Sequence, residues 1–161
     1  MIDRAQVDFP KNQEQMKNYA DEQMVIRKVS GAFTGGAIGG LADSLNIWAL
    51  SHVGVTSLLG VSMKPELTAP WLYQRMVWGG LWMLLLLLPL WQKRIMLRGC
   101  VFSLLPSAMM LGMVLPSMGK GMLGLGFGAL TPVLVIGLNF IYGIIAACWY
   151  KYTVENTERE Y

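Results

Sequence analysis

Charge is scarce over most of this sequence. Only 14% of its 161 residues are charged, whereas a soluble domain carries about a quarter. Residues 29–150 contain eight charged side chains, which leave four long gaps that are apolar or nearly so. A helix that spans a membrane needs roughly 20 mostly apolar residues, and four such segments fit. The scarcity of charge argues against a soluble globular protein and predicts an integral membrane protein.

Residues that commonly carry chemistry are also few. The chain has one histidine, His52, and two cysteines, Cys100 and Cys148, which we expect to be small buried hydrophobes. They form neither a disulfide framework nor a metal-binding motif. No Ser-His-acid set, HExxH motif or GKS/T phosphate loop is present. We therefore expect no catalysis, no cofactor and no metal, and the net charge of +3 gives no reason to expect binding to nucleic acid.

The distribution of charge divides the chain into three regions. We expect a cytoplasmic tail and a short amphipathic helix in residues 1–28, a four-span membrane domain in 29–150, and a cytoplasmic C-terminal tail in 151–161. The first region contains acidic as well as basic residues, and the first apolar run begins only near residue 29. We therefore expect that run to remain as a membrane anchor and not to be cleaved as a signal peptide.

The amphipathic helix is predicted from residues that share one helical face, namely Met16, Tyr19, Ala20 and Met24. No glycine or proline interrupts residues 11–28, so the helix is expected to continue into the first span. We interpret it as an anchor at the membrane interface, and the alternative is a docking site for a partner protein.

The four predicted spans are about 29–50, 71–91, 95–117 and 132–150. The fourth begins late because residues 119–130 are rich in glycine. Thr131 is predicted to cap its helix and Pro132 to occupy the first turn. The glycine-rich segment is either a loop folded back into the protein or a helix kinked at Pro132. The predicted fold is an all-α, integral membrane four-helix bundle with an amphipathic N-terminal helix.

Lysine and arginine set the expected orientation, because they are enriched in cytoplasmic loops. Ten of them would lie on one side, within residues 1–28, 93–98 and 151–161. Three would lie on the other side, namely Lys64, Arg75 and Lys120. We therefore expect a multi-pass protein of a cell inner membrane with both termini in the cytoplasm.

Glycines in the first span form the most specific pattern of the sequence. Gly31, Gly35 and Gly39 are spaced four apart, and Gly36 and Gly40 form a second pair beside them. Small residues at this spacing remove bulk along one stripe, so another helix can approach closely. The pattern predicts tight helix packing and leaves open whether the second helix belongs to the same chain or to another subunit.

The same stripe leads to an intramembrane acid. Four residues after Gly39 comes Asp43, and Asn46 is three further on. A carboxylate near the centre of a membrane costs several kcal/mol, so it must be paired, protonated or hydrated. Arg75 has a similar predicted depth in the second span. We predict an Asp43–Arg75 ion pair with added hydrogen bonds from Asn46 or Gln74, which either fixes helix register or forms an ion- or proton-responsive site.

A further polar group, Asn139, lies near the middle of the fourth span. An amide in a membrane normally forms hydrogen bonds with another helix. We expect a packing role for Asn139, and a polar pathway is the alternative.

Two classes of function remain. The first is a non-catalytic membrane protein that acts through helix packing, as a homo-oligomer or as an accessory subunit of a membrane complex. The second is a small oligomeric channel or transporter with a polar site around Asp43, Asn46 and Arg75. The expected partners are the lipid bilayer and either further copies of the chain or other membrane subunits.

Overall fold

The computed structural model describes residues 9–90 and 94–155, and every regular element within them is helical. The elements are α1 (Phe9–His52), α2 (Val55–Leu58), α3 (Ala69–Met83), the 3-10 helix η1 (Leu84–Leu87), α4 (Ile95–Met109), the π-helix η2 (Met110–Val114), α5 (Leu115–Ser117), the 3-10 helix η3 (Met122–Gly124), α6 (Thr131–Tyr150) and the π-helix η4 (Lys151–Glu155). The all-α prediction is confirmed for this part of the chain. Most of the expected C-terminal tail and the first eight residues lie outside the described residues.

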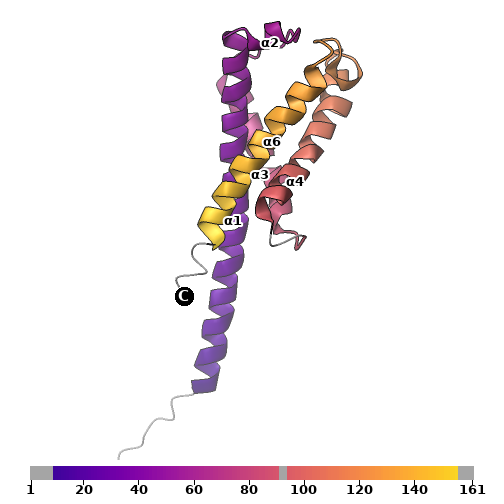
Figure 1. The fold of residues 1–161 in the computed structure, drawn as a ribbon. Coiled ribbons are helices and arrows are strands. Elements are labelled where there is room, and N and C mark those ends of the chain that lie inside the picture. Colours follow the sequence, from indigo (N-terminus) through magenta and orange to yellow (C-terminus); the bar gives the residue numbers. More distant parts are fainter. Residues whose placement is uncertain (1–8, 91–93, 156–161) are drawn as a thin grey trace, which may run out of the picture.

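The helix α1 is unbroken over 44 residues and includes both the predicted amphipathic helix and the predicted first span. Its N-terminal half projects beyond the rest of the molecule (Figure 1). On that half, Met16 and Tyr19 are 65% and 66% exposed. The predicted apolar face therefore exists, but nothing in the described part of this chain covers it.

The second predicted span ends earlier as an α-helix than the sequence indicated. After Met83 the backbone tightens into η1, and Leu88 is extended with φ −64° and ψ 135°. Pro89 explains this change, because proline disfavours the α conformation in the residue before it. Within the described residues, the predicted span of about 71–91 is therefore α-helical only as far as Met83.

The third predicted span is confirmed as a continuous helical segment, Ile95–Ser117. It contains Pro106 within α4, but the irregular winding comes later, in η2. The ring of Pro116 would clash with the carbonyl group four residues earlier, at Gly112, and Pro116 has no N–H group to bond it. A π-turn across Gly112 widens the helix at this point.

The glycine-rich segment is a loop and not a kinked helix. We call residues 118–130 the glycine loop. Gly119, Gly121, Gly124 and Gly128 have positive φ angles there, which glycine adopts without steric cost. The helix α6 begins at Thr131 with Pro132 in its first turn. The prediction that Thr131 caps this helix was wrong, because its hydroxyl group has no hydrogen-bond partner in the described structure and its side chain is buried.

The helices pack in the spatial order α3, α1, α6, α4, and α3 makes few contacts with α4. In Figure 1, α4 and α6 slant away from α1 toward the end of the molecule that carries α2. The larger buried core lies where the helices converge and includes Ala32, Met83, Phe102, Tyr142 and Ala146. The helices are therefore close together at one end and spread apart at the other.

Two helical segments, Ile95–Ser117 and Thr131–Val154, are long and apolar enough to cross a membrane. This supports a membrane association of the chain. The end of α6 lies on the same side of the helical body as the projecting half of α1 (Figure 1).

Candidate functional site

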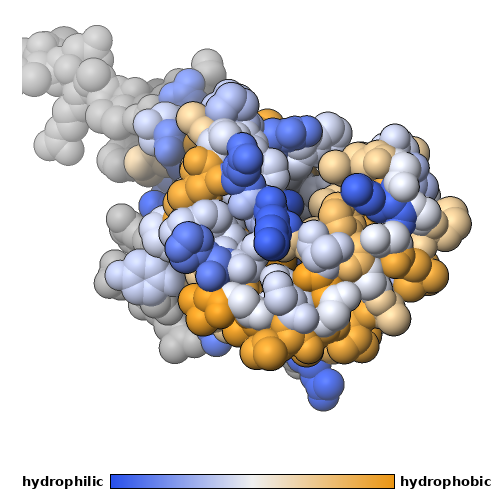
Figure 2. Space-filling model, turned by 90° about the horizontal axis from the view of Figure 1, so that it is seen from above, coloured by the Kyte–Doolittle hydropathy of each residue, from blue (hydrophilic) through white to orange (hydrophobic). Residues whose placement is uncertain are grey.

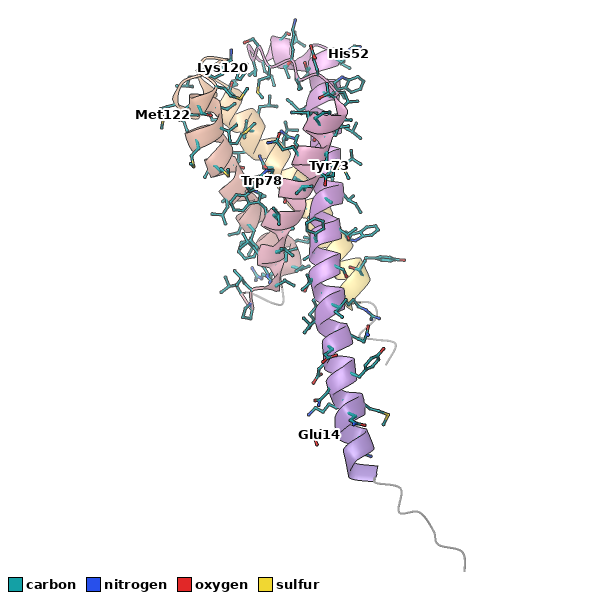
Figure 3. All side chains as sticks on the ribbon, turned by 180° about the vertical axis from the view of Figure 1, so that it is seen from behind. Glu14, His52, Tyr73, Trp78, Lys120 and Met122 are labelled. Carbon is teal, nitrogen blue, oxygen red and sulfur yellow. The ribbon has the colours of Figure 1, made fainter. Side chains whose placement is uncertain are left out.

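The described residues line a half-open cavity of about 780 Å³ between the spread ends of the helices. The helices α1, α3, α4 and α6 all contribute walls, and Trp78 and Trp82 of α3 face residues of α4 and η2 across it. Figure 3 shows Trp78 in the upper half of the helical body, below the end that carries His52 and Lys120. The lining is mostly aromatic and aliphatic, and a few polar side chains interrupt it.

Glycine contacts explain why the helices close at one end only. A Cβ atom placed on Gly35 would lie 2.8 Å from the carbonyl oxygen of Ala146, and one on Gly39 would lie 2.8 Å from that of Tyr142. Such distances are shorter than real side chains tolerate, so only glycine permits this approach of α1 to α6. Gly31 likewise contacts Thr153, which lies in η4 directly after α6.

The second glycine pair faces a different helix. Gly36 contacts the backbone of Gly79, and Gly40 contacts the backbone of Arg75, both in α3. The two stripes of α1 therefore bind two helices of the same chain, α6 and α3. The question that the sequence left open is answered for these five glycines, because each contacts a residue of its own chain.

The predicted ion pair between Asp43 and Arg75 is present, and the Nη2 group of Arg75 donates to Oδ2 of Asp43. Asp43 is 4% exposed, whereas the side chain of Arg75 is 26% exposed. The guanidinium group also lies over the ring of Trp71, with 5.1 Å between its carbon and the ring centroid. Both members of the pair line the cavity, so the charges are placed on the wall shared by α1 and α3.

The predicted hydrogen bonds from Asn46 and Gln74 to this pair are absent from the described structure. Oδ1 of Asp43 has no hydrogen-bond partner there. Asn46 is half-buried outside the cavity lining, and Gln74 is exposed at the cavity. A periodicity of three or four places residues on one helical face, but it does not fix the direction of a flexible side chain.

The predicted hydrogen bond between Asn139 and another helix was also wrong. Its Nδ2 group donates to the carbonyl oxygen of Val135, one turn earlier in α6, over 2.9 Å. A bond between helices is formed instead by Tyr142, whose hydroxyl group donates to the carbonyl oxygen of Gly79 over 2.6 Å. Asn139 also lines the cavity.

A connecting segment covers the wide end of the cavity. We call residues 53–68, which include α2, the strap. The Ser62 amide and hydroxyl groups both donate to the carbonyl oxygen of Phe127 in the glycine loop, over 2.8 and 3.0 Å. At its other side, the Ser51 hydroxyl group donates to the carbonyl oxygen of Met63 over 3.0 Å. The strap therefore connects α1 to the glycine loop across this end.

Figure 2 views the molecule from this end. Hydrophilic residues gather over its middle, with strongly hydrophobic residues beside them. A surface of this kind fits the boundary between a membrane and water, where both environments meet.

The sequence interpretation missed the role of Arg98, which it placed in a cytoplasmic turn. Arg98 is 5% exposed, and its Nη2 group donates to the carbonyl oxygens of Leu86 and Leu88 at the end of η1. These carbonyl groups have no partners within a continuing helix. Arg98 belongs to the third helical segment and therefore caps the end of the second. Its position after Pro89 was the only signal of this role in the sequence.

The cysteines show no common site. Cys148 is exposed, contrary to the expectation of burial, and its Sγ atom lies 3.7 Å from Sδ of Met96. Across residues 9–90 and 94–155, no three His, Cys, Asp or Glu side chains lie close enough together to hold a metal ion.

Comparison of the chain with protein-family models, with curated proteins and with solved structures gives no match. The functional argument therefore depends on the contacts and the cavity of this chain.

Proposed function

We propose that this chain is a non-catalytic, multi-pass protein of a cell inner membrane that acts as an accessory subunit through helix packing. Its four spans are the C-terminal half of α1, α3 with η1, the segment Ile95–Ser117, and α6. The 15 residues of α3 and the four of η1 extend about 30 Å at their usual rises, which is the thickness of a hydrocarbon core. Residues at the ends of these segments are proposed to meet the membrane surface.

The proposed orientation places the projecting half of α1 and the end of α6 in the cytoplasm. Its support is the excess of lysine and arginine on that side. Reporter fusions test it: alkaline phosphatase, which is active only outside the cytoplasm, should be inactive at residue 155 and active at residue 120. Activity at residue 155 would contradict the orientation, and activity at neither position would contradict a multi-pass topology.

One observation carries the accessory role, namely the uncovered apolar face on the projecting half of α1. Met16, Tyr19 and Ile26 are exposed there. The glycine stripes do not supply the assembly surface, because they are occupied by α3 and α6 of the same chain. The proposed contact with other subunits is therefore the cytoplasmic half of α1.

Charge placed on this face should release the partner. We expect Met16→Glu together with Tyr19→Glu to reduce the mass of the complex purified in mild detergent, because two apolar anchors are lost. The matched control is Gln15→Glu together with Asn18→Glu, which adds the same charge at exposed polar positions of the same helix. Light scattering gives the mass, and mass spectrometry identifies the lost chain. An equal mass for both double variants and the unchanged protein would contradict the role.

A second candidate is a small oligomeric channel or transporter. The observation that favours it is the position of Asp43 and Arg75 on the wall of a large cavity. Its polar site differs from the expected one, since Asn46 does not line that cavity. This candidate requires flux of a solute into vesicles that contain the purified chain, which the accessory role does not.

A further inference from the structure

We propose that the cavity binds an uncharged, membrane-dissolved amphiphile with an apolar body and a hydroxyl-bearing head. The proposal goes beyond the accessory role and names a ligand class for the cavity on which the second candidate rests. It depends on the membrane location but not on assembly. Its basis is the position of the neutral Asp43–Arg75 pair, with unused hydrogen-bonding groups, on the wall of a mostly apolar cavity.

The cavity has the size and lining of a small-molecule site. Its volume of about 780 Å³ falls within the roughly 300–1,000 Å³ of known ligand pockets. Trp78, Trp82 and Leu138 lie among its apolar residues, together with Met109 and Met110. Methionine side chains adapt to irregular apolar shapes and make favourable contacts with aromatic rings. The lining therefore suits an apolar body that reaches between α3 and α4.

The polar groups on the wall select the head of the ligand. The opposite charges of Asp43 and Arg75 cancel, as do those of Lys64 and Glu66, which also line the cavity, so a charged head would bring an uncompensated charge into the site. A guanidinium group has five N–H donors, and one hydrogen bond from Arg75, to Asp43, is found in the described structure. Oδ1 of Asp43 has no partner there. A hydroxyl group can accept from Arg75 and donate to Asp43, because the terminal torsion of aspartate is soft enough to turn either oxygen.

The walls of the cavity indicate the route of entry. The strap covers the wide end through its bonds to Phe127. The side between α3 and α4 is the less closed one, because these two helices make few contacts. In the proposed membrane orientation this side faces lipid, so a ligand that is dissolved in the bilayer can enter laterally.

The test uses a bromine-labelled alcohol, ω-bromoundecanol, because bromine quenches tryptophan fluorescence on contact. The purified full chain is reconstituted in phosphatidylcholine vesicles and titrated with this probe. With the hydroxyl group at the ion pair, the bromine reaches toward Trp78 and Trp82, and quenching should saturate. The methyl ether of the same chain lacks the donor for Asp43, and we expect it to bind about tenfold more weakly. The carboxylate, ω-bromoundecanoate, should bind more weakly by a similar factor.

A charge variant should reverse this preference. Asp43→Asn leaves Arg75 without its counter-charge, so we expect the carboxylate to bind about tenfold more tightly than the alcohol. The control is Asp21→Asn, the same change on the same helix at an exposed position of the projecting half, which should preserve the preference for the alcohol. The comparison of alcohol and ether needs no variant, so it tests the proposed binding even if Asp43→Asn does not fold.

Three results would overturn the proposal. Quenching that rises in proportion to the probe without saturation would show bilayer partition only. Equal binding of alcohol and ether would remove the role of the polar pair. Tighter binding of the carboxylate by the unchanged chain would identify an anionic ligand. None of these results bears on the accessory role, which the mass of the purified complex tests separately.

Discussion

Replacement of Gly143 by leucine should separate α4 from α6 and produce a large loss of stability. A Cβ atom at Gly143 would meet the backbone of Gly99 and would lie 3.0 Å from Cβ of Ser103. The neighbour that must move is backbone, which cannot rotate away as a side chain can. Overpacking of a tight contact costs about 1–3 kcal/mol and occasionally more, and we expect the upper end here because backbone must move. We expect the melting temperature of the detergent-solubilised protein to fall by about 10 °C.

The chain offers a matched control on the same helix. Gly137 lies about two turns before Gly143, and a Cβ atom there would meet nothing within 4 Å. Gly137→Leu should leave the melting temperature unchanged or raise it slightly, since leucine favours a helix over glycine by up to about 1 kcal/mol. Equal losses for Gly143→Leu and Gly137→Leu would mean that the α4–α6 contact is not as close as the structure has it.

Replacement of Arg98 by alanine should also have a large effect. The change removes a donor to the carbonyl oxygens of Leu86 and Leu88, of which the latter also accepts from the Leu90 amide, and it opens space around a buried side chain. Hydrogen bonds to a charged group contribute about 1.5–3 kcal/mol each, and an unpaired buried carbonyl group adds a further penalty. We expect a loss of about 3 kcal/mol or more, seen as faster hydrogen exchange in residues 84–90 and as a lower melting temperature.

The comparison variant is Arg94→Ala, because Arg94 is exposed and makes no side-chain cap of α4. It removes the same charge four residues earlier and should leave hydrogen exchange in residues 84–90 unchanged. Arg98→Lys should recover part of the loss, since an ammonium group still reaches a carbonyl oxygen. Arg94 and Arg98 variants with the same effect would show that net positive charge matters here and the capping contact does not.

Several elements of the fold follow from the sequence because one residue type determines them. Pro132 marks the first turn of α6, and four of the five glycines of residues 119–130 have the positive φ angles of a loop. The Asp43–Arg75 pair could be predicted because an isolated charge in an apolar segment needs a partner, and only one cation had a similar depth. The pairing followed from the energetic cost of an unpaired charge in an apolar segment and from the similar depth of the two residues, and both can be inferred from positions in the sequence.

Other features could not be predicted, because they depend on how the helices diverge. The cavity exists since α3 and α4 are separated while α1, α3 and α6 are held by glycine contacts at the other end. Helix lengths and apolar periodicity contain no information on that separation. The partner of Arg98 was missed for a related reason, because a cationic residue near a predicted turn is ordinarily solvated. Arg98 is buried because its side chain reaches the carbonyl groups at the end of η1, and the sequence does not show where those groups lie.

The unbroken course of α1 has a mechanical consequence. The glycines between residues 31 and 40 hold this helix against α3 and α6, while both of its ends extend past that contact. Because this helix is stiff and is held near its middle, it can pivot about the glycine contacts. A tilt of the N-terminal arm would move the opposite arm, which bears Asp43 and Ile47 on the cavity wall, in the reverse direction. Force applied by a bound subunit could thus change the width of the cavity without any hinge in the chain.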